Sequence, residues 1–405
     1  MRVLVISAAF PPLQAPEADH IFHLCQHLTD YGLDVQILTT RGKAAPNQSR
    51  FQVHSLMRHW GWSDLPRFLT FLKRCSPDAV LLMFIDWIYN NHPMITFAPT
   101  FSKALFPHVP FVTKLPNPIG VPPQHSGFSR LFRKAAVRLA GRKHVDYRFG
   151  TLLPDSDRLI VFSNQHLACV SDLCPEAEKK SVLIPPPSIM RMCPENNDAS
   201  RHDGRAALGV NDDDFLVAYF GYIYPGKGVE TLLRAIQIVS RQRSNIRLVL
   251  VGGIIALKFA DRPSYTQEVQ TLPKQLGIED KIIWTGEYAW DSDQASRYLR
   301  AADTCVLPFD NGVHLNNSSF SSVVAHELPI ITTQGAYIEE AFVHQENVLL
   351  CPPKSPDAIA AAIMGLMDKP DLRQRLRIGA QKLSQEWFSW ETAVNRTIQA
   401  LSKAS

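Results

Sequence analysis

The sequence predicts an α/β protein made of two doubly wound domains, each a parallel sheet with helices on both faces. Short apolar runs rich in β-branched residues alternate with helical patterns, and this alternation occurs once on each side of a polar, Pro-rich stretch. The length of 405 residues is enough for two or three domains. Apolar residues make up 45% and charged residues 20%, which excludes a disordered chain and a collagen-like repeat.

The first series of elements occupies residues 1–184, the predicted N-terminal domain. Its apolar runs are continuous, as expected for parallel strands that helices cover on both faces. One helical pattern, Ala18–Tyr31, is followed by Gly32, where a helix C-cap is expected, and another lies at Leu65–Lys73. The predicted strands of this domain are Val3–Ser7, Val35–Thr40, Ala79–Phe84, Pro110–Thr113 and Leu159–Ser163.

Residues 185–212 are predicted to form an interdomain linker, because this stretch is polar, rich in proline and without clear periodicity. A second domain is predicted at 213–370, and the helical pattern of 371–405 predicts helices that pack back toward the first domain. Ligands of such sheets bind at the carboxyl ends of the strands, so a central cleft between the two domains is the expected site. The predicted strands of the second domain are Phe215–Phe220, Arg247–Val251, Ile282–Trp284, Thr304–Leu307, Ile330–Thr332 and Val348–Leu350.

Charge and cysteine content exclude several classes of protein. The net charge of +4, from 42 basic and 38 acidic residues, argues against a dedicated nucleic-acid binder. The seven cysteines form no CxxC pair, so we expect neither a zinc site nor a disulfide framework, but reduced thiols in a cytoplasmic protein. The longest apolar run, Ala79–Ile88, is too short to span a bilayer.

A loop that contains Gly226, Lys227 and Gly228 connects a predicted strand to a predicted helix. A lysine beside a helix N-terminus suits an anion, because free backbone amides and the helix dipole add to its charge. The motif alone is weak, since any strand–loop–helix unit can contain it.

Segments that follow in a fixed order make the motif more specific. They are Arg247–Gly253, Ile282–Gly286, Tyr298–Pro308, Leu328–Thr333 and Asn347–Pro353. This order resembles the donor-binding half of the family 4 glycosyltransferases, which have the GT-B fold. Pro11-Pro12 after the first strand and Asp157–Ser163 resemble parts of the family's first domain, so the resemblance covers nearly the whole chain.

The resemblance implies a retaining transfer of a hexose from a nucleotide-sugar donor to a glycan, lipid-linked or small-molecule acceptor. The C-terminal domain would bind the donor and the N-terminal domain the acceptor. No metal or other cofactor is expected, because basic residues and backbone amides carry the diphosphate charge in this family. Lys227 matches the phosphate-binding lysine of the family, where it would stabilise the charge that develops on the leaving group.

The chain departs from the family pattern at several positions. Tyr222 follows Gly221 where the family usually has an arginine, and His314 and Ser322 stand where the family has its two glutamates. The loop 13–20 lacks the family's Gly-Gly, and no histidine follows the predicted strand 110–113.

From this alignment we predict a catalytic set and a substrate-binding set. Asp86 enters the catalytic set as a polar group at a strand end in the acceptor domain, although an ordinary loop carboxylate is the alternative. Hydroxyls and amides around Asn316–Phe320 are predicted to hold the distal phosphate, although simple helix capping is the alternative. The catalytic set is Lys227, His314 and Asp86. The substrate-binding set is Gly221, Tyr222, Gly253, Glu287, Tyr288, Asn316, Asn317, Ser318, Ser319, Phe320 and Ser322.

Residues 128–143 form the clearest basic cluster, with apolar residues at helical spacing between arginines and lysines. This pattern predicts a basic amphipathic helix that contacts an anionic membrane surface, which would make the protein peripheral on the cytoplasmic face. An ordinary helix packed on the sheet and a contact for an acidic acceptor are the alternatives.

Two other functions stay open on the sequence. The missing glutamates, arginine and Gly-Gly loop fit a non-catalytic GT-B protein that binds a nucleotide or serves as a scaffold. A nucleotide-sugar epimerase of the same fold is the third hypothesis.

Overall fold

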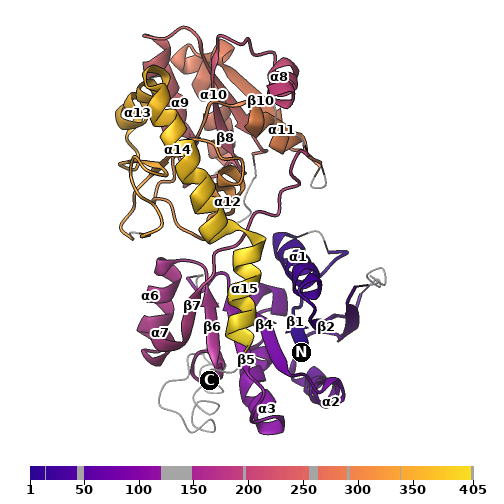
Figure 1. Cartoon of the computed structure of the whole chain (residues 1–405). Helices are drawn as coiled ribbons and strands as arrows, with labels where there is room; N and C mark the ends of the chain where they lie inside the picture. The colour runs from indigo at the N-terminus through magenta and orange to yellow at the C-terminus, as the bar shows by residue number, and fades with distance from the viewer. Residues whose placement is uncertain are drawn as a thin grey trace. The chain divides into compact units, whose positions relative to one another are not determined.

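The computed structural model describes residues 1–13, 15–42, 50–119, 148–194, 198–254, 263–289, 292–337 and 339–402. The chain divides into two compact units, of which the first joins Met1–Pro185 to Trp390–Ser405 and the second is Pro186–Ser389. Each unit contains one parallel sheet flanked by helices (Figure 1). The predicted α/β class with two Rossmann-like domains is therefore confirmed.

The first sheet has the strand order β3-β2-β1-β4-β5-β6-β7. Because the order reverses between β1 and β4, the loops after these two strands diverge and leave room for a ligand at that edge. The strands are β1 (Arg2–Ile6), β2 (Asp34–Thr40), β3 (Gln52–Met57), β4 (Ala79–Met83), β5 (Phe111–Leu115), β6 (Arg158–Val161) and β7 (Ser181–Leu183).

Helices cover both faces of the first sheet, and successive side chains of β1 point into different cores. Val3 and Val5 pack with α1 (Pro16–Asp30) and α15 (Trp390–Leu401), whereas Leu4 and Ile6 pack on the opposite face. The helices on that opposite face are α2 (Leu65–Cys75), α3 (Ala98–Leu105), α5 (Leu152–Asp155), α6 (Asn164–Leu173) and α7 (Glu176–Lys180).

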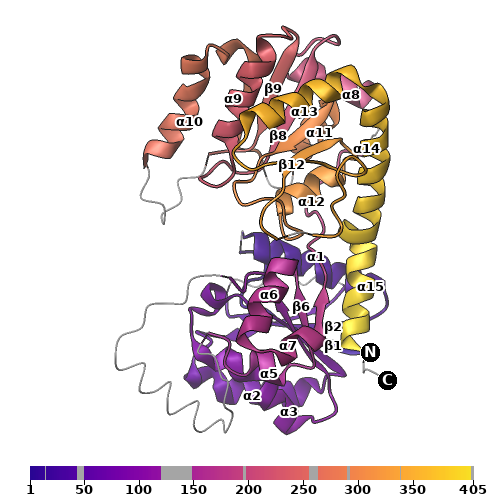
Figure 2. The same ribbon diagram turned by 90° about the vertical axis from the view of Figure 1, so that its left-hand side faces the viewer.

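The second sheet has the order β10-β9-β8-β11-β12-β13, and its reversal lies between β8 and β11. The strands are β8 (Phe215–Phe220), β9 (Ile246–Val251), β10 (Ile282–Gly286), β11 (Thr304–Leu307), β12 (Ile330–Thr333) and β13 (Leu349–Cys351). Helix α9 packs between α10 and α13, as Figure 2 shows, while α11 packs against α8. The helices are α8 (Asp198–Ala207), α9 (Val229–Ser240), α10 (Pro263–Leu276), α11 (Gln294–Ala301), α12 (Ser318–Val324), α13 (Pro356–Asp368) and α14 (Pro370–Leu383).

The structure differs from the predicted elements at three places. Strands β3 and β7 were not predicted, because β3 is polar and only half-buried and β7 has three residues. The predicted linker 185–212 contains α8, which packs against α11. The predicted terminal helices belong to different units: α14 lies in the second, whereas α15 lies in the first because Val394 and Leu401 enter its core.

Among the described residues, no helix is both long and apolar enough to cross a bilayer.

Candidate active site

The loops that follow β8 and β11 meet at the strand-order reversal of the second sheet. A Cβ atom on Gly228 would lie 1.9 Å from the carbonyl oxygen of Pro308, so only glycine allows this approach. The amide of Asp310 donates to the carbonyl of Gly226 over 3.0 Å and fixes the two loops together. Helix α9 begins directly after Gly228, so its free amides face the same loops.

Lys227 projects its ammonium group between two aromatic rings at this junction. Its Nζ lies 5.0 Å from the ring centroid of Tyr224 and 5.0 Å from that of Phe309. Burial lowers the pKa of Lys227 to about 8, because an ammonium group loses hydration there. No carboxylate forms an ion pair with Lys227 in the part of the chain that the structure describes. The site therefore contains a partly desolvated cation whose charge no side chain neutralises.

A second cluster, Asp310 with Glu230, adds acidic groups beside Gly228. Burial and the neighbouring Glu230 raise the pKa of Asp310, and its Oδ1 atom has no hydrogen-bond partner among the described residues. Glu230, in the first turn of α9, accepts a 2.8 Å hydrogen bond from the hydroxyl of Tyr265. These carboxyl groups offer acceptors for sugar hydroxyls close to the lysine loop.

The predicted residues after β8, β9 and β10 lie along one edge of the sheet. A Cβ atom on Gly253 would lie 2.3 Å from Cγ of Glu287, so Gly253 and Glu287 are in close contact. The ring of Tyr288 stacks near Phe220 at 6.4 Å, and Tyr222 is 52% exposed at the end of β8. Gly221, Tyr222, Gly253, Glu287 and Tyr288 therefore form one continuous rim.

Helix α12 starts at Ser318, as predicted, and lies against this rim. A Cβ atom on Gly221 would lie 3.2 Å from the Cβ atom of Ser319. Ser319 is buried, and its hydroxyl has no hydrogen-bond partner among the described residues. The side chain of Phe320, in contrast, packs on Phe342 and Phe388 in the core. Only the backbone of Phe320 is therefore available to a ligand.

His314 lies in the loop before α12, next to a buried carboxylate that the sequence did not reveal. Its Nδ1 atom lies 3.6 Å from Oε1 of Glu339, whose side chain is fully buried. The amide of His314 donates to Oδ1 of Asn317 over 2.7 Å, so Asn317 holds this loop instead of capping α12 with its side chain. The amide of Leu315 also donates to Glu339, which ties the carboxylate to the same loop.

Ser322 is bonded within the second unit. Its hydroxyl lies 3.1 Å from the hydroxyl of Ser188, and its side chain is buried. The predicted substrate contact of Ser322 stays a prediction, and it would require this hydroxyl to exchange its partner.

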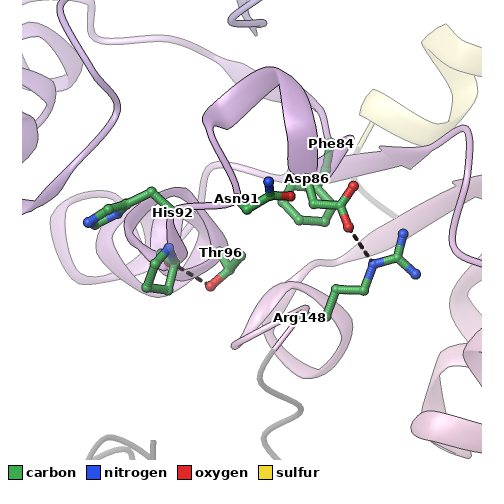
Figure 3. Close-up of a pocket in the computed structure, with 7 residues that line it drawn as sticks. Phe84, Asp86, Asn91, His92, Thr96 and Arg148 are labelled. Atoms are coloured by element: carbon green, nitrogen blue, oxygen red, sulfur yellow. Dashed lines mark hydrogen bonds and ion pairs between the residues drawn. The ribbon is translucent and has the colours of Figure 1, made fainter. Parts of the chain in front are cut away.

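Asp86 lies in the first unit, after the carboxyl end of β4, and is restrained by a buried ion pair. Its Oδ2 atom accepts a 2.8 Å hydrogen bond from Nε of Arg148, and both side chains are nearly buried. Phe84, His92 and Thr96 line a small pocket around this pair (Figure 3). The Arg148 guanidinium also donates to the carbonyl of Asn117 after β5, so the pair fastens two loops together.

The structure thus brings most predicted residues of the second unit to one edge of its sheet. Tyr224, Phe309, Asp310 and Glu339 were missed. The first three lie within five residues of predicted site positions, so proximity in sequence was the available signal. Glu339 lies 25 positions after His314, and nothing in the sequence connects them.

The structure tests neither the prediction of metal independence nor the prediction of membrane contact. Among the residues described, no group of three or more metal-ligating side chains occurs, and independence from metal stays a prediction. The predicted basic helix 128–143 lies outside the described residues.

Comparisons with known proteins found sequence relatives of the second unit and of part of the chain. Residues 200–383 match the family model for glycosyl transferases group 1, entirely within the second unit. A lipopolysaccharide 1,2-N-acetylglucosaminetransferase of Salmonella typhimurium is 27% identical over 273 residues, which are 66% of this chain and 68% of the relative. A D-inositol 3-phosphate glycosyltransferase of Jonesia denitrificans is 26% identical over 262 residues, 63% of this chain but only 57% of the relative.

Solved structures resemble the whole chain in fold. HepE of Anabaena in complex with UDP has a TM-score of 0.71 at 14% identity and covers 99% of both chains. Sucrose-phosphate synthase of Thermosynechococcus elongatus has a TM-score of 0.66 at 18% identity and covers 98% of both chains. The chain therefore has the GT-B fold, and its residues 200–383 match the group 1 glycosyl transferases in sequence.

Proposed function

We propose that the chain transfers a sugar from a nucleotide-sugar donor to an acceptor, with retention of anomeric configuration and without a metal. The observation that carries the proposal is Lys227, a partly desolvated ammonium group at the strand-order reversal, where α/β sheets bind ligands. A diphosphate at this position would give Lys227 the ion-pair partner that no described carboxylate provides. HepE, which shares the fold, has been solved with UDP.

The departing nucleoside diphosphate accumulates negative charge as the glycosidic bond to phosphate breaks. Lys227, the first amides of α9 and the amides at the start of α12 are fixed before the reaction, so they stabilise that charge without reorganising. The unpartnered hydroxyl of Ser319 adds one more donor. The free oxygen of Asp310 would accept a hydrogen bond from a hydroxyl of the transferred sugar.

His314 would act on the sugar side of the donor, and Glu339 would position it. In the neutral imidazole, a proton held on Nδ1 toward Glu339 leaves Nε2 as an acceptor. Glu339 is thus proposed to fix the orientation of His314 rather than to touch the substrate. In the first unit, Asp86 is proposed to bind an acceptor hydroxyl rather than to remove a proton, because Arg148 holds its carboxylate.

Nucleotide binding by the purified chain tests the site. Thermal unfolding is followed with UDP, GDP, ADP and their sugars in the absence of metal, since a ligand bound only by the folded state raises the Tm. We expect one nucleotide to raise the Tm selectively. Lys227→Ala should weaken its binding at least about tenfold, in line with the loss of a charge-assisted contact to phosphate.

Lys274→Ala is the matched control, because Lys274 is an exposed lysine of α10 in the same unit. It should bind the nucleotide as the wild type does. Wild-type affinity in Lys227→Ala would refute the proposed phosphate site. Selective nucleotide binding without turnover of any nucleotide sugar would instead favour the non-catalytic GT-B protein.

Cytoplasmic location, a lipid-linked acceptor and membrane contact through 128–143 belong to the same proposal. Support comes from the similarity to a lipopolysaccharide 1,2-N-acetylglucosaminetransferase and not from the described residues.

A further inference from the structure

A second polar cavity lies in the same unit, at the opposite edge of the sheet from the lysine loop. Ala302 and Asp303 immediately precede β11, and Leu328 and Pro329 immediately precede β12, so the cavity opens at the amino ends of these strands. The start of α14 forms another wall. Its volume is about 650 Å³, which is in the range of small-molecule sites.

Four arginines line this cavity, and they have different roles. Arg201 is structural: it donates to the carbonyl of Ala302 over 2.8 Å and to Oδ1 of Asp303 over 2.7 Å. Arg300, Arg373 and Arg377 form no ion pair with a carboxylate anywhere in the described parts of the chain. Three arginines that form no ion pair among the described residues therefore line one space, which they share with Asp371 and with Asp303, the partner of Arg201.

The surroundings hold these groups in place without neutralising them. Arg373 donates to the carbonyls of Leu366 and Met367 at the end of α13. Arg300 donates through Nη2 to the carbonyl of Cys193, while its buried Nε atom has no partner among the described residues. Among the described residues, no side chain accepts a hydrogen bond from Arg300, Arg373 or Arg377.

The spacing on α14 is unfavourable unless an anion is present. Arg373 and Arg377 are four residues apart, so they project from one face of the helix, and like charges at this spacing destabilise a helix. An anion bound between the two arginines would attract both, so their proximity would then stabilise the helix. Guanidinium groups match the geometry of phosphoryl oxygens, to which they donate in pairs.

The cavity has an apolar side as well. Ala302, Leu328, Pro329 and Pro370 line it with carbon atoms, and the volume greatly exceeds that of a single phosphate ion. His326 contributes no positive charge, because burial lowers its pKa to about 4 and both of its nitrogens are bonded to Ser296 and Ser322.

We infer that this cavity is a second binding site, distinct from the donor site, for a small organic phosphate. Its phosphoryl group would lie between Arg300, Arg373 and Arg377, and its uncharged part would lie against the apolar wall. The inference is independent of the proposed transferase activity, since no residue of the cavity belongs to the proposed catalytic or donor-binding set.

Calorimetric titration of the whole chain with phenyl phosphate tests the inference. Phenyl phosphate combines one phosphoryl group with an apolar body, and the titration is repeated in Lys227→Ala to remove the donor phosphate site. We expect one-site binding that Lys227→Ala retains. Arg377→Gln should weaken it at least about tenfold, because a charge-assisted contact is lost.

Arg377 is exposed on α14, so Arg377→Gln should fold normally, which the Tm checks. Arg375→Gln is the matched control, since Arg375 is an exposed arginine of the same helix that does not line the cavity. The inference is overturned if no binding is detected at millimolar ligand. It is also overturned if Lys227→Ala abolishes binding, or if Arg375→Gln weakens it as much as Arg377→Gln does.

Discussion

Each unit of the chain places a lysine over aromatic rings, and the two lysines show how the units differ. Lys114, on β5 of the first unit, is 1% exposed and lies 5.1 Å from the ring centroid of Phe162. Lys227, in the second unit, lies 5.0 Å from each of two rings in a loop that glycines bring against β11. Both are desolvated, and only Lys227 lies where a ligand can reach its charge.

The comparison teaches that a lowered pKa alone does not identify a site. Burial lowers the pKa of Lys114 to about 7, further than that of Lys227, yet Lys114 is enclosed by its own unit. The loops distinguish the two. Gly228 lets the backbone of two loops come into contact in the second unit, whereas in the first unit the Asp86–Arg148 pair fills the corresponding edge of the sheet.

The largest effect should come from Gly228→Ala, which tests the loop contact. The added Cβ would meet the Pro308 carbonyl at 1.9 Å, and the φ angle of +69° is strained for alanine. We expect a loss of more than about 4 kcal/mol in the free energy of unfolding, measured with urea. Gly226→Ala is the control: it shares a positive φ but has open space, so it should lose only about 1–3 kcal/mol. Equal losses would show that strain, not contact, sets the cost.

Next in size is Arg148→Met, which tests the ion pair of the first unit. Removing one partner leaves the Asp86 carboxylate buried without a counter-charge, at a cost of about 3–5 kcal/mol in unfolding free energy. The double variant Arg148→Met/Asp86→Leu should recover much of this loss, since neither charge is then buried. If the double variant were less stable than Arg148→Met, packing rather than charge would explain the effect.

Lys114→Met should stabilise the chain, and more so at low pH. Because the folded-state pKa of Lys114 is about 7 and the unfolded value about 10.5, the unfolded state binds more protons between these values. Wild-type stability therefore rises with pH from 7 toward 10.5, a dependence that the variant lacks. The stabilisation should be on the order of 2–3 kcal/mol larger at pH 6 than at pH 9, as urea unfolding at both pH values can show. An identical difference at both pH values would contradict the assigned burial of the ammonium group.

The smallest effect concerns the charge on Lys227. With a pKa of about 8, Lys227 loses its proton as the pH rises from 7 to 9, while a nucleoside diphosphate stays fully ionised. The affinity for the diphosphate should fall about tenfold over this range. In Lys227→Arg the affinity should stay constant, because arginine keeps its proton. A parallel fall in both proteins would assign the pH dependence to another group.

Much of the fold was predictable because each element carries a local signal. All six strands of the second sheet match continuous apolar runs, as does β1 of the first. The start of α12 at Ser318 followed from the residues that prefer helix N-termini. Strand β3 was not predicted because apolar and polar residues alternate only weakly in this half-buried edge strand. Strand β7 was not predicted because three residues are too few to show a periodic pattern.

The sequence by itself determined the two parallel sheets, the lysine loop and the resemblance to a family, because periodicity and motif spacing are local properties of the chain. Tertiary structure decided which side chains meet. Glu339 lies beside His314, Arg148 beside Asp86, and arginines from three helices line one cavity. It also assigned α15 to the first unit, far in sequence from the strands that it covers. Such contacts depend on the strand order of each sheet, which brings distant segments together and leaves no trace in local sequence.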